Sequence, residues 1–359
     1  MRRCKNVLYY TFGNGALSHL EGTVKDRKVT KDDYAIYCID HCFSNGLLIN
    51  KLPLSDTDRI IYINTDNEPD TDYIDEIVLS IKRANKYLPA IFIGIGGGST
   101  LDITMAASIL MTNGGRAEDY QGWDLVKDPG VFTVGVPTIS GTGAESSRTC
   151  VMTNHQTGKK LGMNSDYSVF NCLILDPDLS KTVPKNQYFY TGMDTYIHCI
   201  ESLNGRYRNF VGDGFSQQAL KLSEEIFLSS DMQLDENRKK LMVASYFGGC
   251  AIASSFVGLV HPLSAALSVV LGIHHGLANC IVMTAMEEFY PKEVKTFWEM
   301  VNDQHVEIPR GLCHNLSDSQ YDQLYHSMII HEKPLANALG DNFKEILTKE
   351  KVLDIFNAM

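Results

Sequence analysis

Apolar residues follow two different rhythms along the 359-residue chain. In the first half, short apolar or β-branched runs predict strands over 35–39, 59–63, 90–95, 131–136 and 172–175. Residues 72–87 carry apolar side chains at helical spacing, and residues 99–111 are rich in helix formers and small side chains. Because strands and helices alternate, this half favours an α/β fold, with a parallel sheet covered by helices.

The pattern changes after Pro184, where strand-like runs stop. Long helical patterns follow over 187–203, 214–228, 236–256 and 261–271. The segment DPDLSKTVP at 176–184 supplies turn residues and two prolines. The chain is also longer than one hydrophobic core usually supports. We therefore predict an α/β domain over residues 1–180 and an all-α domain over residues 181–359.

Charge and composition exclude several classes of function. The chain has 43 acidic and 32 basic residues, a formal net charge of −11 that repels a nucleic-acid backbone. Its longest apolar stretches are shorter than the ~20 residues that cross a bilayer, and its start lacks the features of a secretory signal. Nine scattered cysteines without a CxxC pair suit free thiols in a reducing compartment. We expect a cytoplasmic protein that binds neither nucleic acid nor membrane.

A glycine-rich segment, AIFIGIGGGST at 90–100, runs from an apolar strand into a helix. Gly97 and Gly98 let the backbone approach an anion, and the amides that open the helix around Ser99 favour negative charge. The segment predicts a phosphate cradle, although a tight turn without a ligand has the same features. Neither Gly13-Asn14-Gly15 nor residues 94–98 has the GxGxxG spacing of the common dinucleotide fingerprint.

Two further signals indicate a nucleotide. PTISGTGAESS at 137–147 follows a strand and offers hydroxyls and glycines, though the same residues suit a polar loop. Asp40 closes the strand over 35–39, where an acid accepts hydrogen bonds from ribose hydroxyls and repels a 2′-phosphate. This position favours NAD over NADP, and its alternative is an exposed turn residue.

Candidate metal ligands lie in the second half. Asp194 and His198 are four residues apart and share a helix face. His261, His274 and His275 follow in an apolar setting, where an imidazole without a partner is costly to bury. One aspartate and three histidines suit Fe²⁺, Zn²⁺, Mn²⁺ or Co²⁺. The alternatives are a surface pair at Asp194 and His198, a core histidine at His261 and a helix cap at His275.

Together these motifs resemble those of the iron-containing, group III alcohol dehydrogenase superfamily. The matching elements are Gly96-Gly97-Gly98-Ser99 with Asp102, residues 137–145, Asp194 with His198, His261, and His275-Gly276. The resemblance implies a Rossmann-like dinucleotide-binding domain, a helical domain of the dehydroquinate synthase-like fold, a metal in the cleft between them and a homodimer. The implied cofactors are NAD(H) and one divalent metal, Fe²⁺ or Zn²⁺, with Co²⁺ and Mn²⁺ as further candidates.

The resemblance also assigns roles to residues. It implies Asp194, His198, His261 and His275 as metal ligands. It places Gly97, Gly98 and Ser99 at the pyrophosphate, and Asp40, Thr138 and Thr142 around the adenosine half. Asp102, Lys160 and Leu175 are similar to further cofactor-contacting positions.

The chain departs from the superfamily pattern in one motif. Most members carry a second histidine four residues after the first, and here Ala265 occupies that position, with Pro262 directly after His261. The resemblance then implies that water, a ribose hydroxyl or another side chain such as His274 positions the substrate or relays the proton. Since alanine is smaller than histidine, a larger or more polar substrate fits this pocket.

Two segments, HPLSAALSVVLGIHHGLANC at 261–280 and IHEKPLANALG at 330–340, are similar to one branch of the superfamily. That branch oxidises 3-deoxy-D-manno-octulosonate (Kdo) at C8 ahead of amination, in lipopolysaccharide sugar biosynthesis. The similarity implies a sugar-acid substrate and a downstream aminotransferase as partner. The candidates to bind the carboxylate are Arg148, Arg206, Arg208 and Lys333.

The expected reaction is metal-assisted oxidation of a primary alcohol to an aldehyde, with hydride passed to NAD and NAD or oxygen as the final acceptor. Three alternatives stay open at this point. Ala265 argues against a short-chain alcohol or diol dehydrogenase. A lyase like dehydroquinate synthase usually has a glutamate where Asp194 stands. A non-enzymatic nucleotide sensor has no need for four metal ligands.

Overall fold

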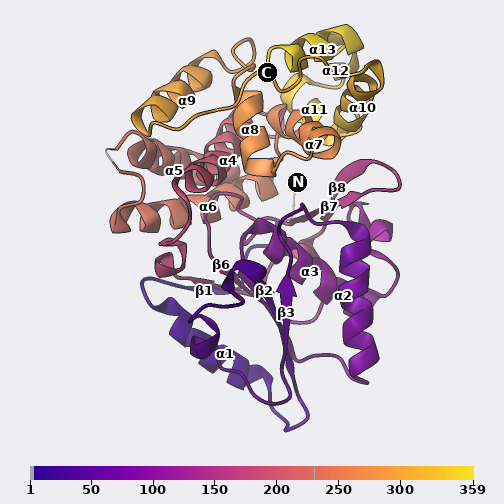
Figure 1. Ribbon diagram of the computed structural model, residues 1–359, viewed down its shortest axis with the longest axis vertical. Coiled ribbons are helices and arrows are strands. Elements are labelled where there is room, and N and C mark those ends of the chain that lie inside the picture. Colours follow the sequence, from indigo (N-terminus) through magenta and orange to yellow (C-terminus); the bar gives the residue numbers. More distant parts are fainter. Residues whose placement is uncertain (1–3, 230) are drawn as a thin grey trace. The chain divides into compact units, whose positions relative to one another are not determined.

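The strand–helix alternation of the first half folds into a parallel sheet in the computed structural model, which describes residues 4–229 and 231–359. Its six strands are β1 (Tyr9–Phe12), β2 (Ala35–Asp40), β3 (Arg59–Ile63), β4 (Ile91–Gly96), β6 (Thr133–Pro137) and β9 (Cys172–Leu175). They run in the order β1-β9-β6-β4-β2-β3, and all neighbouring strands are parallel. Figure 1 labels β1, β2, β3 and β6 of this sheet. The predicted parallel sheet is confirmed.

A second, three-stranded sheet was not predicted. Its strands are β5 (Gly122–Trp123), β7 (Thr149–Asn154) and β8 (Lys159–Asn164), in the order β5-β8-β7. β7 and β8 form an antiparallel hairpin whose turn includes Gly158 at φ 63°. Both strands are rich in polar residues, so neither has the apolar run on which the prediction depended.

Three helices accompany the large sheet: α1 (Leu20–Arg27), α2 (Thr71–Ala84) and α3 (Gly98–Asn113). The Asp70 carboxylate caps α2 by accepting from the Tyr73 backbone N–H at 2.8 Å. The buried face of α2 carries apolar side chains at helical spacing, namely Ile74, Ile77, Val78 and Ile81. The prediction that this helix continues to residue 87 is wrong, because Asn85 has extended backbone at φ −135° and ψ 138°.

The described residues of the second half form helices and connecting loops without a strand, as predicted. Its helices are α4 (Lys185–Asn204), α5 (Phe210–Phe227), α6 (Asp235–Ser255), α7 (Val260–Leu271), α8 (His275–Met283), α9 (Pro291–Asp303), α10 (Asp318–Ile329), α11 (Glu332–Leu339), α12 (Phe343–Ile346) and α13 (Lys349–Asn357). The helix predicted over 236–256 ends one residue early, because Phe256 leaves the helical conformation at φ 77°.

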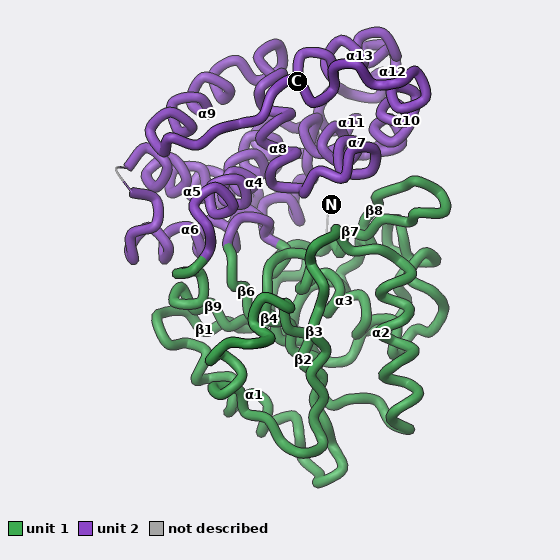
Figure 2. Tube along the Cα trace, in the orientation of Figure 1, with its two compact units in different colours: residues 1–139, 144–182 green, residues 140–143, 183–359 purple. Residues whose placement is uncertain are grey.

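By its internal contacts the chain divides into two compact units (Figure 2). Unit 1 comprises residues 1–139 and 144–182, and unit 2 comprises residues 140–143 and 183–359. Residues 140–143 belong to unit 2 because hydrogen bonds join them to its helices. Gly141 N–H donates to Ser245 Oγ at 2.8 Å, and Thr195 Oγ1 donates to the Gly141 carbonyl at 2.8 Å. These four residues therefore pack against α4 and α6.

The core of unit 2 anchors the helices that carry the candidate metal ligands. Ile197 of α4, Leu263 of α7 and Ile281 of α8 are fully buried in one apolar cluster. Phe189 and Phe227 meet edge to face in the same cluster, with ring centroids 5.4 Å apart. Burying each such side chain stabilises the fold by roughly 1.5–3 kcal/mol. α4, α7 and α8 are thus held together independently of any ligand.

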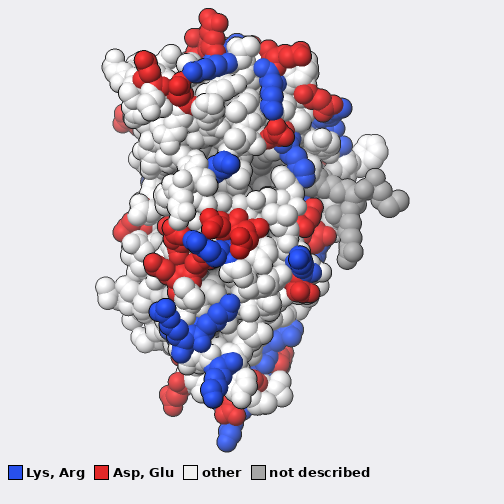
Figure 3. All heavy atoms as spheres, turned by 90° about the vertical axis from the view of Figure 1, so that its right-hand side faces the viewer, with Lys and Arg blue, Asp and Glu red and all other residues white. Residues whose placement is uncertain are grey.

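Surface charges are mixed. On the face shown in Figure 3, lysine and arginine side chains lie beside aspartates and glutamates. Several surface charges form ion pairs, such as Arg206 with Asp341 at 2.7 Å. Within the described chain, no single helix has the length and hydropathy of a membrane span. Only α6 and α7 taken together satisfy that test, and they are bent by 105°.

Candidate metal and nucleotide sites

One face of α4 carries three buried polar side chains. Asp194, His198 and Glu201 follow one another at helical spacing and are 0%, 3% and 1% exposed. The surface-pair alternative for Asp194 and His198 is therefore wrong. Polar groups are costly to bury without partners, so this face requires complementary groups from other helices.

α7 and α8 supply those groups. His261 Nε2 lies 3.2 Å from Asp194 Oδ1, and His275 Nε2 lies 3.4 Å from Asp194 Oδ2. Ligand atoms of these three residues all lie within 4.8 Å of one another. His198 Nε2 approaches Asp194 Oδ1 at 3.3 Å, and its ring stacks on His261 with centroids 4.7 Å apart. The structure thus brings the three predicted histidines around the Asp194 carboxylate, and His261 and His275 form a single cluster with it.

The chemistry of this cluster fits a divalent metal. Asp194 Oδ2 and His198 Nδ1 are buried and accept or donate no hydrogen bond among the described residues. Burial favours a neutral Asp194, but the charges of His198 and His275 and a hydrogen bond from His261 hold its pKa well below the usual value. Burial lowers the pKa of His198 to about 4. An ionised carboxylate and a neutral imidazole are the forms that bind metal.

Glu201 is a further site residue that sequence reasoning missed. Its carboxylate accepts from the Val260 N–H at 2.5 Å and lies 2.5 Å from His261 Nδ1. Burial lowers the pKa of His261, but Glu201 and Asp194 outweigh this and raise it to about 10. A carboxylate on Nδ1 leaves Nε2 facing Asp194, which is the arrangement of a metal-ligating histidine held by an outer carboxylate. Its position seven residues after Asp194, on the same helix face, was the available signal.

We expect Glu201→Gln to weaken metal binding by about 10–100-fold. The neutral glutamine amide cannot replace the charged hydrogen bond by which the Glu201 carboxylate holds the His261 ring. The affinity of metal-free protein for Zn²⁺ is measured by competition with a chelator. Glu224→Gln on α5 changes a half-buried carboxyl elsewhere in unit 2 and should leave the affinity unchanged. Wild-type affinity in Glu201→Gln would contradict the assigned role.

Asn279 is the second residue that was missed. It lies one turn after His275 on α8 and donates from Nδ2 to Asp194 Oδ1 at 2.8 Å. The bond fixes the carboxylate that the histidines surround. His274, predicted as a catalytic alternative, is exposed and occupies the position before α8, while His275 is the first residue of that helix.

The glycine segment of unit 1 forms a close strand-to-helix turn. β4 ends at Gly96, Gly97 caps α3, and Gly97, Gly98 and Ser99 are half-buried at its N-terminus. A Cβ on Gly96 would lie 2.5 Å from Thr100 Oγ1, so only glycine permits this approach. The first turn of this 16-residue helix is a position where backbone amides can bind an anion, and binding of the pyrophosphate there stays a prediction.

The other predicted cofactor residues of unit 1 lie near the ends of its strands. Asp40 ends β2 and accepts from Cys42 N–H at 3.0 Å, and the Thr138 N–H donates to the Gly96 carbonyl at 3.0 Å. Lys160 is buried and pairs with Glu68 at 3.2 Å. Leu175 is buried at the end of β9. Thr142, by contrast, belongs to the four residues that pack with unit 2.

Asp102 has an unusual environment. Its carboxyl accepts from Val151 N–H at 2.9 Å, and burial raises its pKa to about 8. A carboxyl whose folded pKa is raised is neutral in the fold but ionised in the unfolded chain between about pH 4 and pH 8. Its contribution therefore lowers the free energy of unfolding as the pH rises through this range.

We expect Asp102→Asn to remove this pH-dependent decrease in the free energy of unfolding, which amounts to at most about 1.4 kcal/mol per pH unit. The variant should be more stable than the wild type at pH 8, and the difference should shrink toward pH 4. Urea unfolding at a series of pH values measures it. A parallel pH dependence of both proteins would show that Asp102 is not the group responsible.

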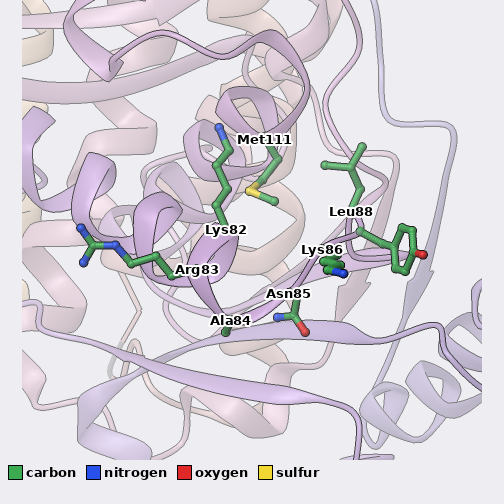
Figure 4. Close-up of a pocket in the computed structure, with 8 residues that line it drawn as sticks. Lys82, Arg83, Ala84, Asn85, Lys86, Leu88 and Met111 are labelled. Carbon is green, nitrogen blue, oxygen red and sulfur yellow. The ribbon is translucent and has the colours of Figure 1, made fainter.

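A surface cavity lies apart from these residues. Figure 4 shows it at the C-terminal end of α2, with a volume of about 600 Å³. Its lining residues are Lys82, Arg83, Ala84, Asn85, Lys86, Tyr87, Leu88 and Met111. None of the predicted site residues is among them, so this cavity belongs to neither candidate site.

Comparison with known proteins identifies the family to which the chain belongs. Residues 9–177 match the family model described as iron-containing alcohol dehydrogenase, and residues 188–324 match that of the C-terminal part of the Fe-containing alcohol dehydrogenase family. The chain belongs to the iron-containing alcohol dehydrogenase family. Membership confirms the predicted superfamily. The family is described as iron-containing, and the cluster of Asp194, His261 and His275 is the candidate to hold the metal.

Individual members of the family are similar over part of their length. Sulfoacetaldehyde reductase of Bilophila wadsworthia is 32% identical over 220 residues, covering 61% of this chain and 56% of that protein. NAD-dependent methanol dehydrogenase of Bacillus methanolicus is 33% identical over 193 residues, covering 53% and 51%. The matches span about half the length of these relatives. The fold matches alcohol dehydrogenase from Oenococcus oeni with a TM-score of 0.85, at 21% identity and over 100% of both chains.

Proposed function

We propose that this iron-containing alcohol dehydrogenase family member oxidises a primary alcohol to an aldehyde with NAD, and that its substrate is a sugar acid such as Kdo, oxidised at C8. The observation that carries the proposal is the buried cluster of Asp194, His261 and His275. The glycine turn at the start of α3 supplies the matching nucleotide signal in unit 1.

The chemistry follows from the groups present. A divalent metal held by Asp194, His198, His261 and His275 would supply Lewis-acid polarisation of the substrate hydroxyl. Asn279 and Glu201 keep the ligand side chains in place through their hydrogen bonds to Asp194 and His261. Bound NAD⁺ would accept the hydride from the carbinol carbon, and the hydroxyl proton would pass to solvent, so that the products would be the aldehyde, NADH and one proton.

Two features support an acidic, extended substrate over a simple alcohol. Ala265 is buried one turn after His261 on α7, where it adds only a methyl group. The similar protein from Bilophila wadsworthia is named for sulfoacetaldehyde, an anionic aldehyde. Of the predicted carboxylate partners, Arg148 pairs with Asp166 at 3.2 Å and Arg208 with Asp213 at 2.8 Å. Lys333 lies in the first turn of α11.

A short-chain alcohol dehydrogenase is the second candidate, because the similar Bacillus methanolicus protein is named for methanol. The lyase alternative is weakened by the family match, which covers both halves of the chain. A nucleotide sensor has no use for the buried cluster around Asp194.

The deciding experiment is NADH formation by Zn²⁺- or Fe²⁺-loaded protein with Kdo, 1,2-propanediol and glycerol. His261→Ala is the test variant and His326→Ala, which removes an exposed imidazole, is its control. Kdo-dependent activity lost only in His261→Ala supports the proposal. Activity on the diols alone would favour the second candidate, and oxygen uptake without NADH would identify an oxidase.

A further inference from the structure

Phe256 has a backbone conformation that is almost reserved for glycine. It follows α6 at φ 77° and ψ 161°. The other non-glycine residues with positive φ in the described chain are Asp124, His305 and Asn315, at φ 50–62°. Aspartate, asparagine and histidine are the side chains most often found there, whereas a bulky residue is an outlier. Such strain persists only where surrounding contacts enforce it, and it concentrates at ligand-binding positions.

Asn337 of α11 enforces this conformation. Its side chain is 1% exposed, and its Nδ2 donates to the carbonyls of Phe256 at 3.3 Å and Val257 at 3.0 Å. Its Oδ1 accepts from the Tyr207 N–H at 2.8 Å, and its own carbonyl accepts from the Arg206 N–H at 2.7 Å. One buried amide thus joins the segment after α4 to the segment after α6.

The ring of Phe256 is half-buried and meets two side chains of different character. Tyr207 packs edge to face against it, with centroids 5.4 Å apart and an interplanar angle of 82°. Lys333 Nζ lies 5.9 Å from the ring centroid. An aromatic face beside an ammonium group suits a ligand that has both carbon–hydrogen faces and a carboxylate.

The same segment leads directly to the metal cluster. A Cβ on Gly258 would lie 3.2 Å from Glu201 Oε1, and the Val260 N–H is bonded to that carboxylate at 2.5 Å. His261 comes next in the chain. Phe256 and His261 are therefore the two ends of one short segment, clamped by Asn337 at one end and by Glu201 at the other.

We propose that Phe256 is a specificity-determining residue, fixed by the positioning residue Asn337 so that its ring, with Tyr207 and Lys333, binds the body and carboxylate of a polyhydroxylated acid. The inference rests on the proposed alcohol oxidation and names its substrate class. Glycine would fit this backbone without strain, whereas phenylalanine is strained there, and strain of this kind concentrates at binding positions.

Phe256→Gly separates this role from a structural one. We expect the KM for Kdo to rise about tenfold, with kcat and the kinetics on 1,2-propanediol within about twofold of wild type. The unfolding temperature should stay close to that of wild type, because relief of the backbone strain offsets the lost packing of the ring on Tyr207 and the added freedom of the unfolded chain. Phe256→Tyr keeps the ring and should restore the low KM, whereas Lys333→Gln should raise the KM for Kdo alone. A lower unfolding temperature with equal losses on both substrates would overturn the proposal.

Direct binding separates failure of this inference from failure of the proposed reaction. Calorimetry with Kdo and with D-gluconate is run on wild type and Phe256→Gly. If no alcohol is oxidised but wild type binds the acids about tenfold more tightly than the variant, the reaction is wrong and the specificity role stands. Activity on the diol with equal or absent binding of both acids would overturn the specificity role and leave the oxidation intact.

Discussion

Replacing Asp194 by asparagine is expected to abolish metal binding by the protein. Asp194 is fully buried, and the Nε2 atoms of His198, His261 and His275 approach its carboxylate at 3.2–3.4 Å. Asparagine keeps the shape but removes the only negatively charged group among the four candidate ligands. Loss of a charged ligand from a buried site should lower metal affinity by at least about 10³-fold, more than the loss of the outer carboxylate Glu201.

The measurement does not depend on turnover. Metal-free wild type should gain thermal stability when Zn²⁺ or Fe²⁺ is added, by the linkage between ligand binding and folding, and Asp194→Asn should gain none. Asp213→Asn is the matched control, since it neutralises an aspartate of the same unit that pairs with Arg208. An equal metal-dependent gain in Asp194→Asn would remove this cluster as the metal site.

Much of the fold was predictable because apolar periodicity reflects the face that each element buries. β3 and β9 have the predicted bounds, and α7 begins one residue early. The elements and helix ends that were not predicted have local causes. The strands of the β7–β8 hairpin are polar, and β1 is only four residues long with mostly exposed side chains. The helix end at Asn85 was missed because the apolar spacing was read through an asparagine, although asparagine is a recognised helix terminator. The end at Phe256 was missed because phenylalanine is not one.

The site was predictable only in part. Asp194 and His198 share a helix face by spacing alone, but His261 and His275 joined them through the family resemblance. Glu201 has only the weak signal of its helical spacing from Asp194, and Asn279 lies one turn after His275. The roles of both depend on which atoms of α7, α8 and α4 meet in the fold. The same holds for Asn337, which lies beyond the matched family region that ends at residue 324. Long-range hydrogen bonds of this kind have no periodicity to detect.

Replacing Gly141 by alanine is expected to destabilise the fold by more than about 4 kcal/mol. Gly141 has φ 149°, a conformation that L side chains rarely adopt, and an added Cβ would lie 1.7 Å from the Thr191 carbonyl oxygen. Because that oxygen belongs to the backbone of α4, the clash cannot be relieved by a side-chain rotation. Equilibrium unfolding in urea measures the loss.

Gly214→Ala is the matched control. Gly214 is exposed on α5, and nothing lies within 4 Å of an added Cβ. Alanine there should stabilise the helix by about 0.5–1 kcal/mol. A Gly141→Ala protein within about 1 kcal/mol of wild type would show that residues 140–143 are not packed on α4 as described. Since Thr191 precedes Asp194 by less than one helical turn, surviving Gly141→Ala protein should also bind metal more weakly, because the shift that relieves the clash moves the carboxylate.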